Sequence, residues 1–268
     1  MNDIARNQEF DRLVSLIQEL EAELAGLVLE RDNLLYHVCP KLQAEYMLKI
    51  GKLEYAIFEY QCKILRVKRE IEIIQSFLNR EQSYDIEKIE EQLDKEYKEY
   101  TENLLEKQKE IEKARLSKSS YGRLLTDEES SELKKLYVII VKKLHPDINP
   151  DTTEEQHSQF SDAVNAYKNA DLSELKVIYL LMEKTPVSVE KDVNSMDKLK
   201  ARKEMLLDEK KYLADEILKI KETFPYTARD LLLDEIKLQN KIDELSNLLT
   251  EYHEQYMGIE SRLKEIQR

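Results

Sequence analysis

The tripeptide His145-Pro146-Asp147 places an imidazole and a carboxylate on either side of a proline. A histidine beside an aspartate can act as a general acid or base. Such catalysis needs further groups, and the sequence shows no nucleophile elbow, no HExxH pair and no glycine-rich phosphate loop. His37 and Cys39 lack a matching second pair of metal ligands, and Cys39 and Cys62 lack CxxC spacing. We therefore predict no enzyme, no metal site, no cofactor and two free thiols.

An amphipathic helix is predicted directly before the tripeptide, over residues 131–144. Its apolar residues share one arc of a helical wheel: Leu133, Leu136, Tyr137, Ile140, Val141 and Leu144. The opposite arc carries four lysines: Lys134, Lys135, Lys142 and Lys143. Pro146 disfavours helical geometry at His145, so the helix should end there and the tripeptide should begin an exposed loop.

Two more short helices are predicted after this loop. Thr152 and Glu155 have capping-box spacing, and Asp171 and Glu174 repeat it before the next helix. The first of these helices places apolar side chains on one face, at Phe160, Ala163 and Tyr167. The second should bury Leu175, Ile178, Leu181 and Met182. Residues 121–184 are thus predicted to form a small helical module, closed by Thr185-Pro186.

The segment from about residue 128 to 172 resembles the J-domain of DnaJ-type co-chaperones. In that family a basic helix ends in Tyr-x7-His-Pro-Asp, and Tyr137 with the tripeptide matches this spacing. The downstream Phe-x5-Ala-Tyr pattern is matched by Phe160 and Ala166-Tyr167. The resemblance implies a helix pair whose loop docks on an ATP-bound DnaK-type heat-shock chaperone and stimulates its ATP hydrolysis.

The resemblance also implies a role for each matched residue. The trigger would be His145, Pro146 and Asp147, and Tyr137 would support the helix pair. An acidic groove of the chaperone would attract the lysines of the preceding helix: Lys134, Lys135, Lys142 and Lys143.

Two features depart from the family pattern. Only Tyr121, Leu124 and Leu125 are available before Asp127 to form the core-facing side of a first J-domain helix. That helix is therefore short, absent or supplied by the coiled coil. In addition, Val138 and Ile139 stand where the family usually has basic residues. Because a β-branched apolar pair is a poor surface beside lysines, we expect both to be covered, either by a partner or by a helix of the chain's own coiled coil, and we favour the second.

Heptad patterns predict coiled coils on both sides of the module. Apolar residues recur at alternating spacings of four and three over 13–34, where Arg31 is the one interruption, and again over 46–78. After the module, heptad spacing resumes, with residues seven apart at Leu199, Leu206, Leu213 and Ile220. Because proline breaks helices, we expect reversals near Pro40 and Pro225, giving antiparallel hairpins over 8–80 and 192–268. A third, more charged helix is predicted over 85–117, followed by a linker over 116–122. The predicted divisions are therefore 1–117, 121–184 and 192–268.

Composition supports an all-α, elongated protein, because the 268 residues include only four glycines and five prolines while 36% are charged. The net charge of -13 argues against nucleic-acid binding. No apolar run reaches the roughly 20 residues that cross a bilayer, and no secretory signal is seen at the start. We expect a cytoplasmic protein without a membrane partner.

Two functions fit these features. The first is a J-domain co-chaperone that recruits a DnaK-type ATPase to a protein target bound by the coiled-coil arms. The second is a structural coiled-coil scaffold whose J-like module no longer stimulates a chaperone. Neither the target nor the oligomeric state follows from the sequence, although the apolar seams are also compatible with a homodimer.

Overall fold

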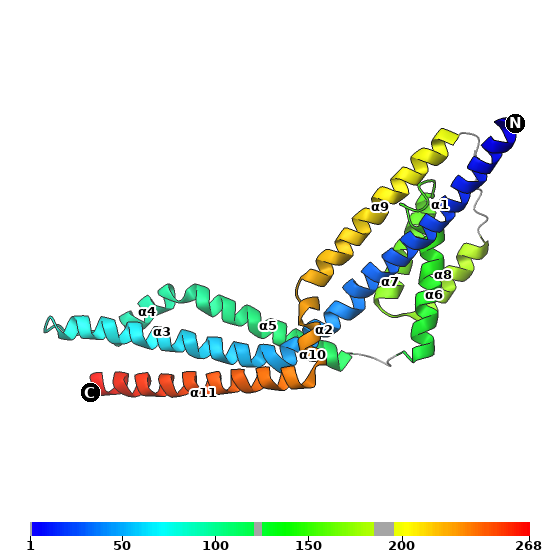
Figure 1. Ribbon diagram of the computed structural model, residues 1–268. Helices are drawn as coiled ribbons and strands as arrows, with labels where there is room; N and C mark the ends of the chain where they lie inside the picture. The colour runs from blue at the N-terminus through cyan, green and yellow to red at the C-terminus, as the bar shows by residue number, and fades with distance from the viewer. Residues whose placement is uncertain (1, 121–124, 185–195) are drawn as a thin grey trace. The chain divides into compact units, whose positions relative to one another are not determined.

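The structure of the chain is a computed structural model that describes residues 2–120, 125–184 and 196–268 (Figure 1). Every element within these ranges is a helix, and none of them contains a strand. The all-α prediction is therefore confirmed. None of the described helices has both the length and the apolar character that a membrane span requires.

The chain divides into two compact units, and each unit is assembled from two separate stretches of sequence. Unit 1 comprises Met1–Pro40 and Arg123–Thr227, and unit 2 comprises Lys41–Gly122 and Ala228–Arg268. These boundaries differ from the predicted divisions at 1–117, 121–184 and 192–268, because each unit joins an N-terminal helix to a C-terminal one.

In unit 1, α1 (Asn2–Asn33) packs along α9 (Met196–Glu222). The two helices run parallel, because ion pairs join Glu9 to Lys200 at 3.6 Å and, further along both helices, Glu30 to Lys221 at 2.6 Å. Their buried seam contains predicted heptad residues of both helices: Leu20, Leu24, Leu206 and Leu213. The heptads were therefore identified correctly, but α9 pairs with α1 rather than forming the predicted antiparallel hairpin.

The three-helix module, also in unit 1, consists of α6 (Asp127–Leu144), α7 (Glu154–Lys168) and α8 (Leu172–Lys184), which pack on one another. Helix α6 begins with a capping box from Thr126 to Glu129. The box that begins α7 uses Thr153 and Gln156, one residue later than predicted. Asp171 caps α8, where its carboxylate accepts the Glu174 N–H at 2.9 Å, as its spacing predicted.

The apolar residues predicted for α8 are buried with one exception. Leu175, Ile178 and Met182 lie in the core, whereas Leu181 is 50% exposed. Thr185 and Pro186, which were predicted to close the module, lie outside the described residues.

Pro40 lies inside a helix, so the predicted chain reversal is not found there. Five consecutive elements cover this region: α1, η1 (Leu34–Val38), α2 (Cys39–Tyr46), η2 (Met47–Gly51) and α3 (Lys52–Leu78). A proline normally clashes with the carbonyl four residues earlier. Here a π-helical turn precedes it, with the Cys39 N–H bonded to the Leu34 carbonyl, and this wider turn accommodates the ring.

In unit 2, α3 packs along α11 (Glu235–Ile266), and the helices again run parallel. The pairing is visible in two core clusters, one joining Ile57 to Leu245 and the other joining Ile74 to Leu263. The predicted break near Pro225 is confirmed, because α9 ends at Glu222. The chain then continues through η3 (Tyr226–Ala228) and α10 (Arg229–Leu233).

The predicted third helix over 85–117 is two helices, α4 (Ile86–Glu96) and α5 (Lys98–Ser120), separated at Tyr97. Both pack on α3. The linker expected from Leu116 is helical as far as Ser120, and Tyr121 and Gly122 lie outside the described residues.

Candidate functional site

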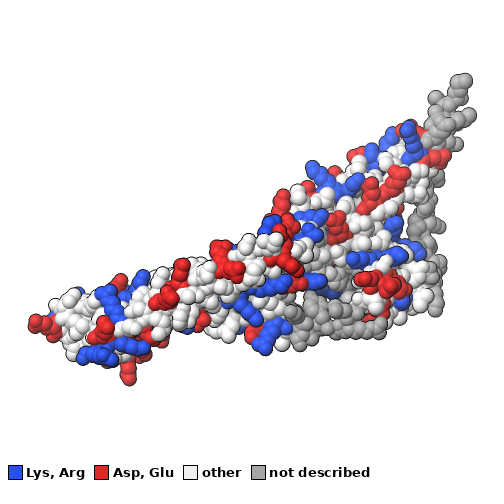
Figure 2. All heavy atoms as spheres, turned by 60° about the horizontal axis from the view of Figure 1, so that its bottom comes forward, with Lys and Arg blue, Asp and Glu red and all other residues white. Residues whose placement is uncertain are grey.

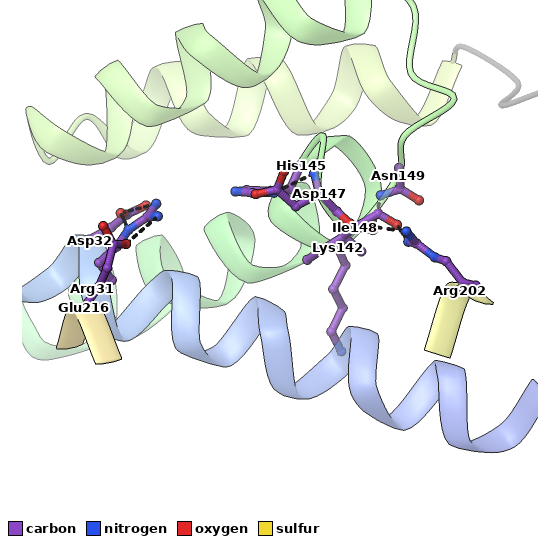
Figure 3. A network of polar contacts seen from close by, with 9 residues as sticks. All are labelled: Arg31, Asp32, Lys142, His145, Asp147, Ile148, Asn149, Arg202 and Glu216. Carbon is purple, nitrogen blue, oxygen red and sulfur yellow. Dashed lines mark hydrogen bonds and ion pairs between the residues drawn. The ribbon is translucent and has the colours of Figure 1, made fainter. Parts of the chain in front are cut away.

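The tripeptide begins a tightly turned loop, residues 145–153, that caps the end of α6. The His145 N–H still bonds to the Val141 carbonyl at 3.0 Å, but the backbone of His145 is extended, as the following proline requires. The Asn149 N–H returns to the His145 carbonyl at 2.8 Å, and the Asn149 side-chain amide donates to the Lys142 carbonyl at 2.7 Å (Figure 3). We call residues 145–153 the tripeptide loop.

His145 is a buried anchor of this loop, not an exposed tip. Its ring meets the Phe160 ring edge-on at 5.0 Å between centroids, and its Nδ1 accepts the Asp147 N–H at 3.2 Å. Burial is the main influence on its charge and lowers the pKa of His145 below the ordinary value. A neutral ring that accepts this hydrogen bond fixes the backbone of the tripeptide.

Asp147 is the residue that the tripeptide loop presents to solvent. Its side chain is 51% exposed, and its Oδ2 lies 3.7 Å from Nδ1 of His145. The Asp147 carboxylate is therefore accessible from solvent. Within the tripeptide, the predicted exposure therefore applies to Asp147 and does not apply to His145.

Tyr137 joins the module to α1, which sequence reasoning did not foresee. Its hydroxyl donates to Oδ2 of Asp32 at 2.5 Å, and its ring stacks on Tyr167 with centroids 4.1 Å apart. Asp32 is only 2% exposed and also accepts from Nε of Arg31 at 2.9 Å, while Arg31 lies 3.7 Å from Glu216 of α9. Burial first, and then the Asp32 carboxylate, raise the pKa of Tyr137. The one sequence signal for this network was Arg31, which interrupts an otherwise apolar seam.

Helix α6 packs on α1 as well as on α7 and α8.

The lysines of α6 are all exposed, as predicted: Lys134, Lys135, Lys142 and Lys143. On the face shown in Figure 2, basic and acidic side chains are interspersed.

The two apolar departures on α6 have different environments. Val138 is half-buried and packs against the core of unit 1, whereas Ile139 is 37% exposed. The expectation that both are covered is therefore right for Val138 and wrong for Ile139. Adjacent residues of an α-helix point about 100° apart, so Val138 can face the core while Ile139 faces solvent.

Two residues of α9 lie at the tripeptide loop and were missed by sequence reasoning. Arg202 donates to the Asp147 carbonyl at 3.4 Å and to the Ile148 carbonyl (Figure 3). Glu209 lies close enough to Asp147 that the two carboxylates interact. Seven residues separate Arg202 from Glu209, so the heptad places both beside the buried Leu206. Nothing in the sequence indicated which loop they would meet.

The described residues contain no cluster of three or more metal-ligating side chains. Both Cys39 and Cys62 are buried free thiols, as predicted. No family model matches the chain, and no curated protein or solved structure matches it either.

Proposed function

We propose that this protein is a cytoplasmic J-domain-type co-chaperone that docks a DnaK-type heat-shock chaperone at the tripeptide loop. The observation that carries the proposal is the exposed carboxylate of Asp147, held on a rigid turn at the end of a helix with four exposed lysines. The coiled-coil arms would select a protein target and bring the chaperone to it.

The lysines and Asp147 would contribute to docking in different ways. Exposed lysines near the loop would attract an acidic groove and raise the association rate, more strongly at low salt. The Asp147 carboxylate would form charge-assisted hydrogen bonds after docking. Because hydrogen bonds within the loop fix its backbone, little conformational entropy would be lost on binding.

A structural scaffold is the second candidate, and one specific observation favours it. The backbone carbonyls of Asp147 and Ile148 are already bonded to Arg202 of the same chain. A loop used only as an internal spacer would have such contacts permanently, and the scaffold would stimulate no chaperone.

The deciding experiment measures single-turnover ATP hydrolysis by a purified DnaK-type chaperone with the wild type and with Asp147→Asn. We expect the variant to lose stimulation by roughly tenfold or more, because a charge-assisted contact is removed from the centre of the interface. Asp151→Asn is the matched control, since Asp151 is an exposed aspartate of the same loop outside the tripeptide.

The two variants should keep the helical circular dichroism and the melting temperature of the wild type, because surface carboxylates contribute little to stability. Absence of any stimulation by the wild type would rule out the co-chaperone and leave the scaffold. Equal loss in Asp147→Asn and Asp151→Asn would show that general loop charge, not the tripeptide, is responsible.

A further inference from the structure

Helix α9 holds the tripeptide loop from one side. Figure 3 shows the guanidinium of Arg202 reaching from α9 to the backbone beside Asp147. It donates to two successive carbonyls, those of Asp147 and Ile148. A guanidinium that serves two backbone carbonyls fixes the position of the loop as well as its shape.

Arg202 is itself held in place by the coiled coil. Its side chain is only 18% exposed and lies 3.5 Å from the Glu21 carboxylate on α1. The adjacent Leu206 is buried in the seam between α1 and α9. The contact with the loop therefore depends on α9 remaining packed on α1.

A second side chain of α9, Glu209, lies near the carboxylate of Asp147. Burial, and next the nearby Asp147 carboxylate, raise the pKa of Glu209 above its ordinary value. Arg202 and Glu209 are thus two side chains of α9 at the loop, one at its backbone carbonyls and one near the Asp147 side chain.

The geometry points to α9 acting as a clasp that lowers the affinity of the tripeptide loop for the chaperone, and release of α9 from the loop raises that affinity. This inference rests on the proposed function. A chaperone that contacts Asp147 must approach a residue whose own carbonyl, and that of Ile148, are already bonded to Arg202. Chaperone binding and the contact between α9 and the loop are thermodynamically linked. Release of α9 therefore raises the affinity for the chaperone, and chaperone binding weakens the α9 contact by the same factor.

The test compares Arg202→Ala with Lys210→Ala in the full-length protein. Both replace a cation of α9 that pairs with α1, since Lys210 contacts Glu23 at 2.6 Å, whereas only Arg202 of the two bonds to the carbonyls of Asp147 and Ile148. Binding of each variant to a purified DnaK-type chaperone with ATP is measured by titration. A hydrogen bond from a charged group changes an equilibrium constant by a factor of roughly ten or more. After allowance for the partial exposure of the Arg202 side chain, we expect Arg202→Ala to bind the chaperone about three- to tenfold more tightly than the wild type. Lys210→Ala should bind like the wild type.

Amide hydrogen exchange gives a readout that does not involve the chaperone. Exchange at Ile148 and Asn149 should become faster in Arg202→Ala and stay unchanged in Lys210→Ala. Should the alanine variant misfold, Arg202→Lys keeps the charge near Glu21 but loses the paired donors, and smaller shifts in the same direction are expected.

The outcomes separate the clasp from the proposed function. If the wild type binds and stimulates the chaperone but Arg202→Ala and Arg202→Lys bind no more tightly, the clasp is wrong and the co-chaperone function stands. If neither the wild type nor the variants bind, the co-chaperone function is wrong, and the inferred role of α9 is wrong as well. Equal tightening in Lys210→Ala would assign the effect to general loosening of α1 and α9, which also overturns the clasp.

Discussion

The hydroxyl of Tyr137 shows how one residue can connect several helices. It extends from α6 to Asp32 of α1, while the tyrosine ring stacks on Tyr167 of α7. Asp32 is almost fully buried, so its charge depends on the tyrosine and on Arg31 for compensation. The position that the family resemblance assigns to support of the helix pair thus also links the module to the coiled coil.

Removal of this hydroxyl should destabilise unit 1. We expect Tyr137→Phe to lower the free energy of unfolding by about 1.5–3 kcal/mol, because a buried hydrogen bond to a charged group is lost. Tyr212→Phe is the control, since its hydroxyl also donates to a carboxylate, Glu216 at 2.9 Å, but on an exposed side chain. Urea unfolding should show a change below about 0.5 kcal/mol for that control. Similar losses in both variants would contradict the role of burial.

His145 and His37 should make the stability of unit 1 sensitive to acid. Burial is the main cause that lowers the pKa of His145, opposed by Asp147 and Asp32 and assisted by Arg31, and burial also lowers the pKa of His37. The unfolded chain therefore takes up protons first as the pH falls. Their contribution is present above the unfolded pKa of about 6.5 and is lost as the pH falls through the lower folded pKa.

Urea unfolding between pH 7.5 and 5.5 should record this loss, and His145→Gln should make the dependence shallower. Glu209 acts in the opposite direction at lower pH, because its pKa is raised in the folded state. A nuclear magnetic resonance titration checks His145 directly. A measured pKa at or above 6.5 for its ring in the folded protein would refute the burial argument.

At the scale of elements, α6 has three kinds of surface. One face is buried in the module, the lysines are exposed, and Val138 lies between these two faces against the core. Ile139, one residue further, is the exposed apolar residue among the lysines. The two residues that depart from the family pattern therefore have different physical roles.

Separate lysine substitutions test this difference. Val138→Lys should destabilise the protein by roughly 1 kcal/mol or more, because apolar burial is lost and a charge is placed against the core. Ile139→Lys should stay within about 0.5 kcal/mol of the wild type, as expected for a surface site. Under the proposed function it should also increase salt-sensitive association with the chaperone. Equal destabilisation by both changes, measured in urea, would argue that Ile139 is covered.

At the scale of the molecule, each unit depends on residues far apart in the sequence. Leu24 of α1 shares a core with Leu206 of α9, and Ile74 of α3 shares one with Leu263 of α11. Long-range pairing of this kind means that a local defect affects distant segments of the same unit.

Amide hydrogen exchange of two core variants can test the division into units. Leu24→Ala should lower protection in α6 and α9, and Ile74→Ala should lower it in α4 and the end of α11, because each opens a cavity in one core. Each cavity should cost about 2–5 kcal/mol in its own unit. Loss of protection along contiguous sequence blocks, such as all of residues 2–78, would instead favour the divisions expected from sequence.

The sequence by itself determined the elements that depend on local physics. Heptad spacing identified Leu206 and Leu213 as seam residues, the proline at 146 ended α6 at His145, and the aspartate at 171 capped α8. These features depend on side-chain periodicity and backbone angles within a few residues, so they can be read without the fold.

The tertiary structure decided which partner each surface meets. A heptad seam shows which face must be buried but not against which helix, and so α9 pairs with α1 where a hairpin was expected. A π-helical turn before Pro40 kept the chain helical at a residue that local rules treat as a break. The burial of His145 and the reach of Arg202 to the loop likewise depend on helices brought together from opposite ends of the chain. Contacts over such sequence distances are set by packing, and a local pattern carries no information about them.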